Sequence, residues 1–230
     1  MSKLYLVPNS INEEAQNLLP EYIACAIKDI RAFFVEEPKS ARRLLKGVNP
    51  QFPLSECRFF DLNEHSNSKQ VQEYVQTLKE GDCAIISEAG CPCVADPGAD
   101  LVLLAHQNHI EIIPLVGPSS ILMALMASGL NGQNFAFNGY LPKDRQERIR
   151  KIKLLEDRSI KENQTQIFME APYRNQSMLD DILAVAQDKT NLCIACDITA
   201  PQQFIKTMSI KEWKKHPVNI DKKPTLFLLH

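Results

Sequence analysis

Two short stretches of small residues are the strongest candidates for chemistry in this sequence. The first runs from Ser87 to Gly98 and the second from Val116 to Ser120, and each follows an apolar, strand-like run and precedes a helical one. Glycine and proline expose bare backbone to a ligand, and open α/β sheets bind ligands where their strands end. The two stretches therefore predict a crevice for a small molecule.

Signatures of several other chemistries are missing from the sequence. There is no Gly-rich loop followed by Lys-Ser/Thr, no Gly-x-Gly-x-x-Gly after the first strand-like run, no hydrolase serine elbow and no His-Glu-x-x-His. The pairs Cys91/Cys93 and Cys193/Cys196 have the residue types of a zinc site, but Cys193 lies in an apolar run, where cysteine packs as a small hydrophobe. We expect no metal, which leaves metal-free group transfer.

Strand-like and helical patterns alternate along the chain, beginning with the apolar run from Lys3 to Val7. Such alternation predicts an α/β fold with mostly parallel sheets. The alternation of strand-like and helical runs changes after Gly129. We therefore predict two α/β domains, residues 1–115 and 116–230, connected at the second small-residue stretch.

The net charge and the lengths of the apolar runs indicate where the protein is located. The 230 residues carry a formal net charge of −2, which gives no global basic field for nucleic acid. No apolar run approaches the roughly 20 residues of a membrane span, and the N-terminal residues lack the apolar core of a secretory signal. We therefore expect a cytoplasmic protein without a membrane partner.

Several motifs follow one another in a fixed order. Leu4–Pro8 and Val35–Leu45 come first, a block from Ser87 to Pro142 contains both small-residue stretches, and Phe168–Arg174 follows. This series resembles the tetrapyrrole-methylase superfamily of S-adenosylmethionine-dependent methyltransferases. Within it, the chain looks most like the branch that methylates the 2′-oxygen of a cytidine in small-subunit ribosomal RNA. The resemblance covers nearly the whole chain.

The resemblance implies a fold, a cofactor and partners. It implies two α/β domains with S-adenosylmethionine in the cleft between them, a homodimer, and ribosomal RNA or the small ribosomal subunit as partner. Carried onto this chain, the cofactor contacts fall at strand ends. They are Pro8, Gly90, Cys91, Pro92, Ala95, Ser119, Ser120, Met169, Glu170, Ile198, Pro224 and Thr225.

The chain departs from that branch mainly where the substrate would bind. Glu88 stands in place of an aspartate, Glu37–Lys39 in place of an Asp-Thr-Arg triplet, and Cys196–Ala200 in place of an Arg-Glu-Leu-Thr-Lys element. Two other interpretations therefore stay open: a methyltransferase for a tetrapyrrole-like small molecule, and a paralogue that binds the cofactor without catalysis.

Methyl transfer to a hydroxyl needs alignment of donor and acceptor and is helped by a base. Glu36 and Glu37 are the candidate catalytic carboxylates, although both also suit the N-terminus of a helix that begins near Pro38. Glu170, at a strand end, fits orientation of the cofactor better than the role of a base.

Cationic side chains are the candidates for binding the substrate. Lys39 and Arg42 have the chemistry to hold a phosphate or carboxylate, although arginine on a helix is also typical of a solvated face. The helical segment from Asp144 to Arg158 contains Arg145, Arg148, Arg150, Lys151 and Lys153 and forms a local basic patch for RNA. Its interspersed acidic residues favour the alternative of an ordinary solvated surface.

Overall fold

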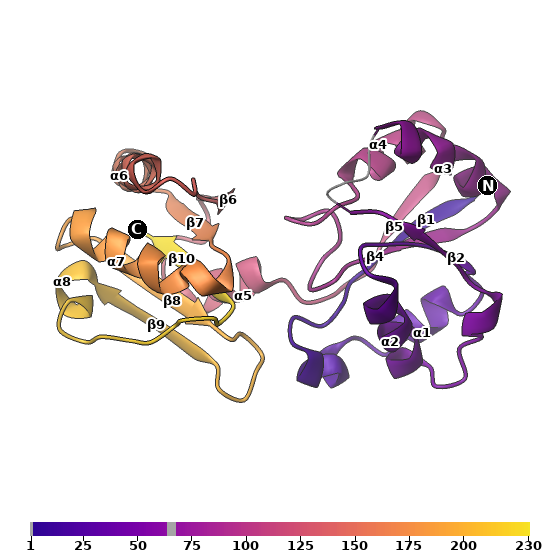
Figure 1. Ribbon diagram of the computed structural model, residues 1–230, viewed down its shortest axis with the longest axis horizontal. Helices are drawn as coiled ribbons and strands as arrows, with labels where there is room; N and C mark the ends of the chain where they lie inside the picture. Colours follow the sequence, from indigo (N-terminus) through magenta and orange to yellow (C-terminus); the bar gives the residue numbers. More distant parts are fainter. Residues whose placement is uncertain (1, 64–67) are drawn as a thin grey trace. The chain divides into compact units, whose positions relative to one another are not determined.

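The computed structural model describes residues 2–63 and 68–230, and the chain divides into two compact units, Met1–Ser119 and Ser120–His230 (Figure 1). The division lies inside the second small-residue stretch, whereas the sequence placed it at the beginning of that stretch. Each unit is an α/β structure with its own sheet and core.

The first unit is built on a parallel sheet with the strand order β3-β2-β4-β1-β5. The strands are β1 (Lys3–Val7), β2 (Ala32–Val35), β3 (Arg58–Asp61), β4 (Cys83–Ile86) and β5 (Glu111–Pro114). The helices are α1 (Tyr22–Ile27), α2 (Pro38–Val48), α3 (Ser68–Glu80) and α4 (Ala99–Gln107), with short 3-10 turns at Glu13–Leu18 and Leu54–Glu56.

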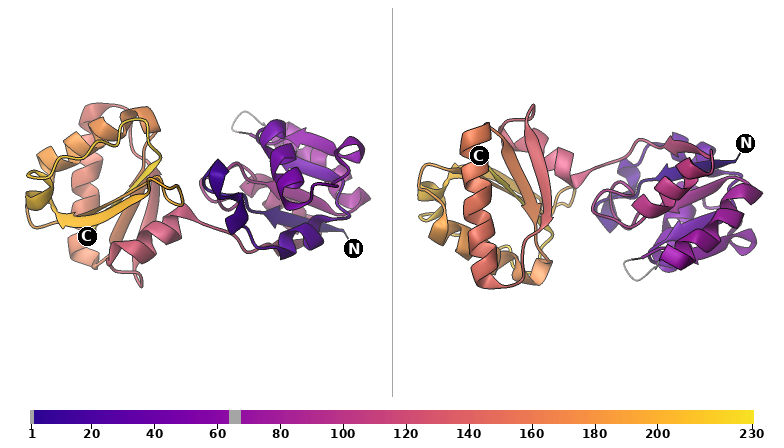
Figure 2. Two further views of the ribbon diagram at one scale, coloured as in Figure 1. Left: turned by 90° about the horizontal axis from the view of Figure 1, so that it is seen from below. Right: turned by 90° about the horizontal axis from the view of Figure 1, so that it is seen from above.

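Helices cover both faces of this sheet (Figures 1 and 2). Residues of α1 and α2 pack with Phe33 on one face, and residues of α3 and α4 pack with Phe34 on the other. Strands β2 and β4 are buried along their whole length, which explains why their sequences are continuously apolar instead of alternating.

The second unit contains a sheet with the order β6-β7-β10-β8-β9. The strands are β6 (Phe135–Tyr140), β7 (Thr165–Met169), β8 (Asn191–Cys196), β9 (Phe204–Ser209) and β10 (Thr225–Leu229). The helices are α5 (Ser120–Ser128), α6 (Arg145–Glu162), α7 (Asn175–Val185) and α8 (Ile210–Trp213), with a 3-10 turn at Pro172–Arg174. Residues of α6, α7 and α8 pack on one face of the sheet and residues of α5 on the other.

The prediction of mostly parallel sheets is confirmed for the first unit and is wrong for the second. In the second sheet only β6 and β7 are parallel, while β10 is antiparallel to both β7 and β8, and β8 is antiparallel to β9. For β8 and β9 the cause is the short connection from Cys196 to Phe204, because a parallel crossover needs a dozen or more residues. The sequence reading did not identify β9, which contains the polar residues Lys206 and Thr207.

Within the described residues, no helix combines the length and the apolar composition that crossing a bilayer requires.

Candidate functional site

The carboxyl ends of β1 and β4 form the topological switch point of the first sheet. These strands are neighbours, and the helices that follow them, α1 and α4, contribute to the cores on opposite faces of the sheet. Ligand crevices in open α/β sheets lie at such a point. Here the loops after the two strands are joined, because Asn9 and Gly90 exchange two backbone hydrogen bonds of 2.9 and 3.0 Å.

Two glycines let the loops at this edge of the sheet pack closely together. Gly90 has a φ of +75°, in the left-handed region that strains other residues. A Cβ on Gly117 would lie 2.2 Å from the ring of Pro8, so only glycine fits between the β5 loop and the β1 loop. The Cys91 thiol donates to the Pro118 carbonyl at 3.4 Å. The loops after β1, β4 and β5 therefore meet, which brings the predicted residues Pro8, Gly90, Cys91 and Pro92 together.

Asn9 stabilises this junction, and sequence reasoning missed its role. Its Nδ2 donates to the carbonyls of Ser87 and Glu88 at 3.1 Å each, and its Oδ1 accepts from the Ser10 amide at 2.8 Å. An amide side chain two residues after the end of β1 was the signal, since it can satisfy backbone groups at the strand end.

The rest of the predicted first-unit residues occupy the two loops. Ala95 is exposed and has a φ of +57°, close to Cys93 at +65°. Ser119 is the last residue of the first unit, and Ser120 is the first residue of α5.

A group of carboxylates lies at the same edge of the first sheet. Glu36 directly follows β2, and Glu88 and Asp96 lie in the loop after β4, the strand that pairs with β2. Burial is the main cause that raises the pKa of Asp96 to about 6; the charges of Glu36 and Glu88 also raise this pKa, and a hydrogen bond with Ser87 lowers it. Burial also raises the pKa of Glu88, as do Glu36 and Glu37. The sequence did not single out Asp96 as a base, because its burial depends on the loop.

Glu37, Lys39 and Arg42 lie at or near the beginning of α2, as the sequence indicated. The Glu37 carboxylate accepts a hydrogen bond from the Lys39 amide at 2.9 Å and caps the helix. Lys39 and Arg42 are exposed, and the Arg42 guanidinium lies 4.6 Å from the centre of the Phe59 ring. The helix-capping explanation therefore applies to Glu37, whereas Glu36 stands beside the other carboxylates.

The predicted residues of the second unit gather at one edge of its sheet. Met169 ends β7 and pairs with Leu226, and Thr225, which begins β10, directly precedes Leu226. Thr225 also pairs with Cys196 at the end of β8, and the Asp197 amide donates to the Pro224 carbonyl at 2.9 Å. Glu170 directly follows β7, Ile198 lies two residues after the end of β8, and both are buried.

Several polar atoms at this edge are buried and lack a hydrogen-bond partner among the described residues. They are Glu170 Oε2, Arg174 Nε, Asn175 Oδ1 and Thr199 Oγ1. Burying such groups unpaired costs free energy, so they mark a place where a ligand or water supplies the missing partner.

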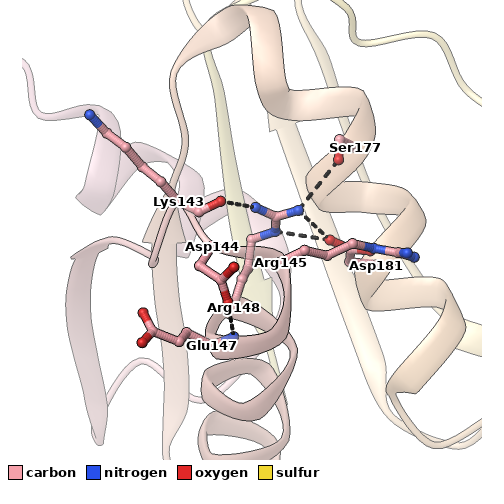
Figure 3. Close-up of polar contacts among 7 residues, drawn as sticks. All are labelled: Lys143, Asp144, Arg145, Glu147, Arg148, Ser177 and Asp181. Atoms are coloured by element: carbon pink, nitrogen blue, oxygen red, sulfur yellow. Dashed lines mark hydrogen bonds and ion pairs between the residues drawn. The ribbon is translucent and has the colours of Figure 1, made fainter.

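Two arginines of the basic helix α6 form ion pairs with a residue of α7 (Figure 3). Arg148 is buried, and its Nε and Nη2 donate to Asp181 Oδ2 at 2.9 and 2.6 Å. The Nε of Arg145 donates to Asp181 Oδ1 at 2.9 Å. Arg148 therefore fixes α6 to α7 and does not belong to an RNA-binding face, which corrects the basic-patch interpretation at that residue.

The cysteines have the properties of thiols at neutral pH. Burial raises the pKa of Cys91, and it raises the pKa of Cys93 to about 11, with Asp96 adding to the effect. Burial likewise raises the pKa of Cys193 and Cys196. Among residues 2–63 and 68–230, no group of three or more His, Cys, Asp or Glu side chains has the geometry to hold a metal ion.

Comparison with known proteins assigns the family. The family described as Tetrapyrrole (Corrin/Porphyrin) Methylases matches residues 9–214. The chain belongs to the tetrapyrrole methylases. It is 30% identical over 231 residues to Ribosomal RNA small subunit methyltransferase I of Vibrio cholerae, covering 99% of this chain and 76% of that protein. As in this family, it is a methyltransferase that uses S-adenosylmethionine.

Solved structures of tetrapyrrole methylases share the fold. The methyltransferase CobJ superposes with a TM-score of 0.65 at 17% identity, covering all of this chain and 94% of CobJ. Uroporphyrin-III C-methyltransferase from Thermus thermophilus, crystallised with S-adenosylhomocysteine, superposes with a TM-score of 0.51 at 14% identity, covering 99% of this chain and 97% of that one.

The residues present fit the adenosyl cofactor. The first unit offers the backbone of Gly90 and Gly117, which carry no side chains of their own, and glycine backbone suits close approach of a flat or extended ligand. The second unit offers unpaired acceptors, among them Glu170 Oε2 and Thr199 Oγ1, which suit the hydroxyl and amino donors of a nucleoside.

Proposed function

We propose that this enzyme transfers the methyl group of S-adenosylmethionine to the 2′-hydroxyl of a cytidine in small-subunit ribosomal RNA. The observation that carries the proposal is the similarity to Ribosomal RNA small subunit methyltransferase I of Vibrio cholerae along nearly the whole chain. Similarity to the structures of tetrapyrrole enzymes lies below 20% identity and supports only the fold.

Residues of both units bind the cofactor in this proposal. Pro8, Gly90, Cys91, Pro92 and Ala95 contribute from the first unit, and Ser119 and Ser120 lie where the units join. The second unit contributes a further group. This group is Met169, Glu170, Ile198, Pro224 and Thr225. Their role is mainly alignment, which contributes about 7–11 kcal/mol in favourable cases.

The carboxylates at the first-unit edge supply the base. The bound cofactor supplies a methyl group activated by a positively charged sulfur. Asp96, with a pKa of about 6, is ionised at neutral pH and still basic enough to take the proton of an acceptor hydroxyl. Glu36 stands beside it and is the alternative base, whereas Glu37 caps α2. Lys39 and Arg42, on the exposed face of α2, hold a phosphate of the substrate.

Methyl transfer from tritium-labelled S-adenosylmethionine tests the acceptor. The full chain is incubated with small ribosomal subunits from cells that lack the enzyme and, separately, with a tetrapyrrole extract. We expect label in the RNA, recovered as 2′-O-methylcytidine after nuclease digestion. Label only in the tetrapyrrole fraction, or in neither substrate, contradicts the proposal.

The proposed substrate also implies a setting and an assembly. Small ribosomal subunits are assembled in the bacterial cytoplasm, so the enzyme works there. We infer a homodimer from the family resemblance, and sedimentation equilibrium tests it: a mass twice the 26.0 kDa of the chain is expected, and a monomer at all concentrations overturns the inference.

A further inference from the structure

Tyr173 is one of several aromatic residues exposed at the edge of the second sheet where β7 ends; Tyr140, which pairs with Met169, is another. Tyr173 lies in the 3-10 turn that follows β7, three residues after Glu170, and 66% of its surface is accessible. Tyrosine is enriched at binding interfaces because it combines an apolar ring with a polar hydroxyl.

The Tyr173 ring has a fixed cation against it. The Arg174 guanidinium lies 5.4 Å from the ring centre, within the range of a cation–π contact. Arg174 is itself held by an ion pair with the buried Glu170, which balances its charge. Its Nε is buried and has no hydrogen-bond partner among the described residues. The ring is therefore supported on a rigid base that retains an unused donor.

Two lysines lie beside the same turn. The Lys222 amide donates to the Pro172 carbonyl at 3.0 Å, and the Asn175 side chain donates to the Lys223 carbonyl at 2.6 Å. Both lysines are exposed, and within the described part of the chain no ion pair engages either of them. The backbone bonds therefore place Lys222 and Lys223 next to the turn that carries Tyr173, with the exposed Asp221 preceding them in the sequence.

The charge of the chain is distributed unevenly between its units. Residues 1–119 contain 10 Lys and Arg against 16 Asp and Glu, a formal charge of −6. Residues 120–230 contain 16 Lys and Arg against 12 Asp and Glu, a formal charge of +4. A polyanion is therefore attracted to the second unit, although the whole chain is weakly acidic.

We propose that Tyr173, Lys222 and Lys223, supported by Arg174, bind the single-stranded RNA segment that carries the methyl acceptor. We name these four residues the aromatic–lysine surface. A base stacks on the Tyr173 ring and the lysines contact the flanking phosphates, which is the arrangement by which proteins bind single strands. The inference rests on the proposed function and assigns it a substrate-binding surface, at the sheet edge that also carries Met169 and Thr225.

Fluorescence anisotropy with a short, labelled, cytidine-rich RNA tests the surface over a series of salt concentrations. Tyr173→Leu is expected to weaken binding about 5- to 150-fold without changing the salt dependence, because only stacking is lost. Tyr173→Phe keeps the ring and should bind like the wild type. Lys222→Ala with Lys223→Ala should reduce the slope of log K against log salt by about 1.4, since each phosphate contact contributes about 0.7.

The matched control is the pair Lys211→Ala and Lys215→Ala. These lysines are also exposed and lie in the second unit, but the Lys211 amide bonds to Asp188 near the beginning of β8, at the opposite edge of the sheet. This variant should keep the wild-type affinity and salt slope. Calorimetry with S-adenosylhomocysteine should give the same affinity for all variants, which shows that each has folded.

The outcomes separate the surface from the proposed function. Suppose that the wild type binds the RNA and methylates small subunits, and that Tyr173→Leu and the Lys222/Lys223 variant bind the RNA as well as the wild type does. The proposed binding surface is then wrong, whereas the proposed function still holds. If both lysine pairs reduce the salt slope equally, binding is diffuse and the surface is likewise wrong. If the wild type neither binds RNA nor methylates subunits, the proposed function fails first.

Discussion

Replacing Asp96 with asparagine should stabilise the protein while reducing catalysis. In the unfolded chain this carboxyl ionises near pH 3.8, and in the folded protein near pH 6, because it is partly buried close to Glu36 and Glu88. That difference corresponds to about 3 kcal/mol of cost for the ionised form at neutral pH. Partial exposure of the side chain screens the charge and lowers the value to about 1–2 kcal/mol. Asparagine has no charge, so the Asp96→Asn variant avoids this destabilisation.

The sign of this effect depends on pH. Between about pH 4 and pH 6 the folded state binds more protons at Asp96 than the unfolded state does, so this group lowers stability as the pH rises. In urea unfolding at about pH 8, Asp96→Asn should therefore be more stable than the wild type by about 1–2 kcal/mol, and the gain should vanish near pH 4. Asp29→Asn, at an exposed aspartate, is the control and should show no such gain.

The catalytic rate of Asp96→Asn should decrease, although its stability should increase. If Asp96 takes the acceptor proton, Asp96→Asn should lose about 10²–10⁴-fold in kcat, and wild-type kcat should fall as the pH decreases through about 6. A variant that is less stable than the wild type at about pH 8, or whose stability difference does not change with pH, would refute the burial argument. Unchanged kcat would leave Glu36 as the base.

Two further substitutions test the packing around the site. Gly117→Ala places a Cβ 2.2 Å from the Pro8 ring, so we expect a loss of about 1–3 kcal/mol in unfolding free energy and weaker S-adenosylhomocysteine binding by calorimetry. Gly81→Ala, where nothing lies within 4 Å, should change neither, and equal behaviour of the two variants would contradict the close approach. Arg148→Met leaves a buried carboxylate with one partner and should cost about 3–5 kcal/mol. The exposed Arg150→Met on the same helix should stay within about 0.5 kcal/mol, and an equally small loss at Arg148 would show that its pair does not stabilise the fold.

Much of the first unit could be predicted from its sequence because its strands are buried on both faces. The run Cys83–Ile86 is apolar throughout, and the glycine-rich stretch after it marks the strand end. The second unit was harder to predict. Strand β9 carries Lys206 and Thr207 among its apolar residues, and its antiparallel pairing follows from a short loop whose geometry composition does not reveal.

Prediction of the site from the sequence has the same limit. Residues that act through backbone shape, such as Gly90 and Gly117, could be identified because glycine and proline report backbone conformation directly. Residues that act through their surroundings could not. Asp96 has an altered pKa only because the loop buries it near other carboxylates, and Arg148 is withdrawn from solvent only because α7 presents Asp181 to it. Such effects depend on contacts between residues that lie far apart in the sequence.

Calorimetric titration of the wild-type chain with S-adenosylhomocysteine tests whether the loops at Gly90 and Gly117 hold the cofactor. We expect one molecule bound per chain, and we expect Gly117→Ala to weaken this binding whereas Gly81→Ala leaves it unchanged. Absence of any binding heat at millimolar nucleoside, or equal binding by the two glycine variants, would contradict the claim that the loops at Gly90 and Gly117 hold the cofactor.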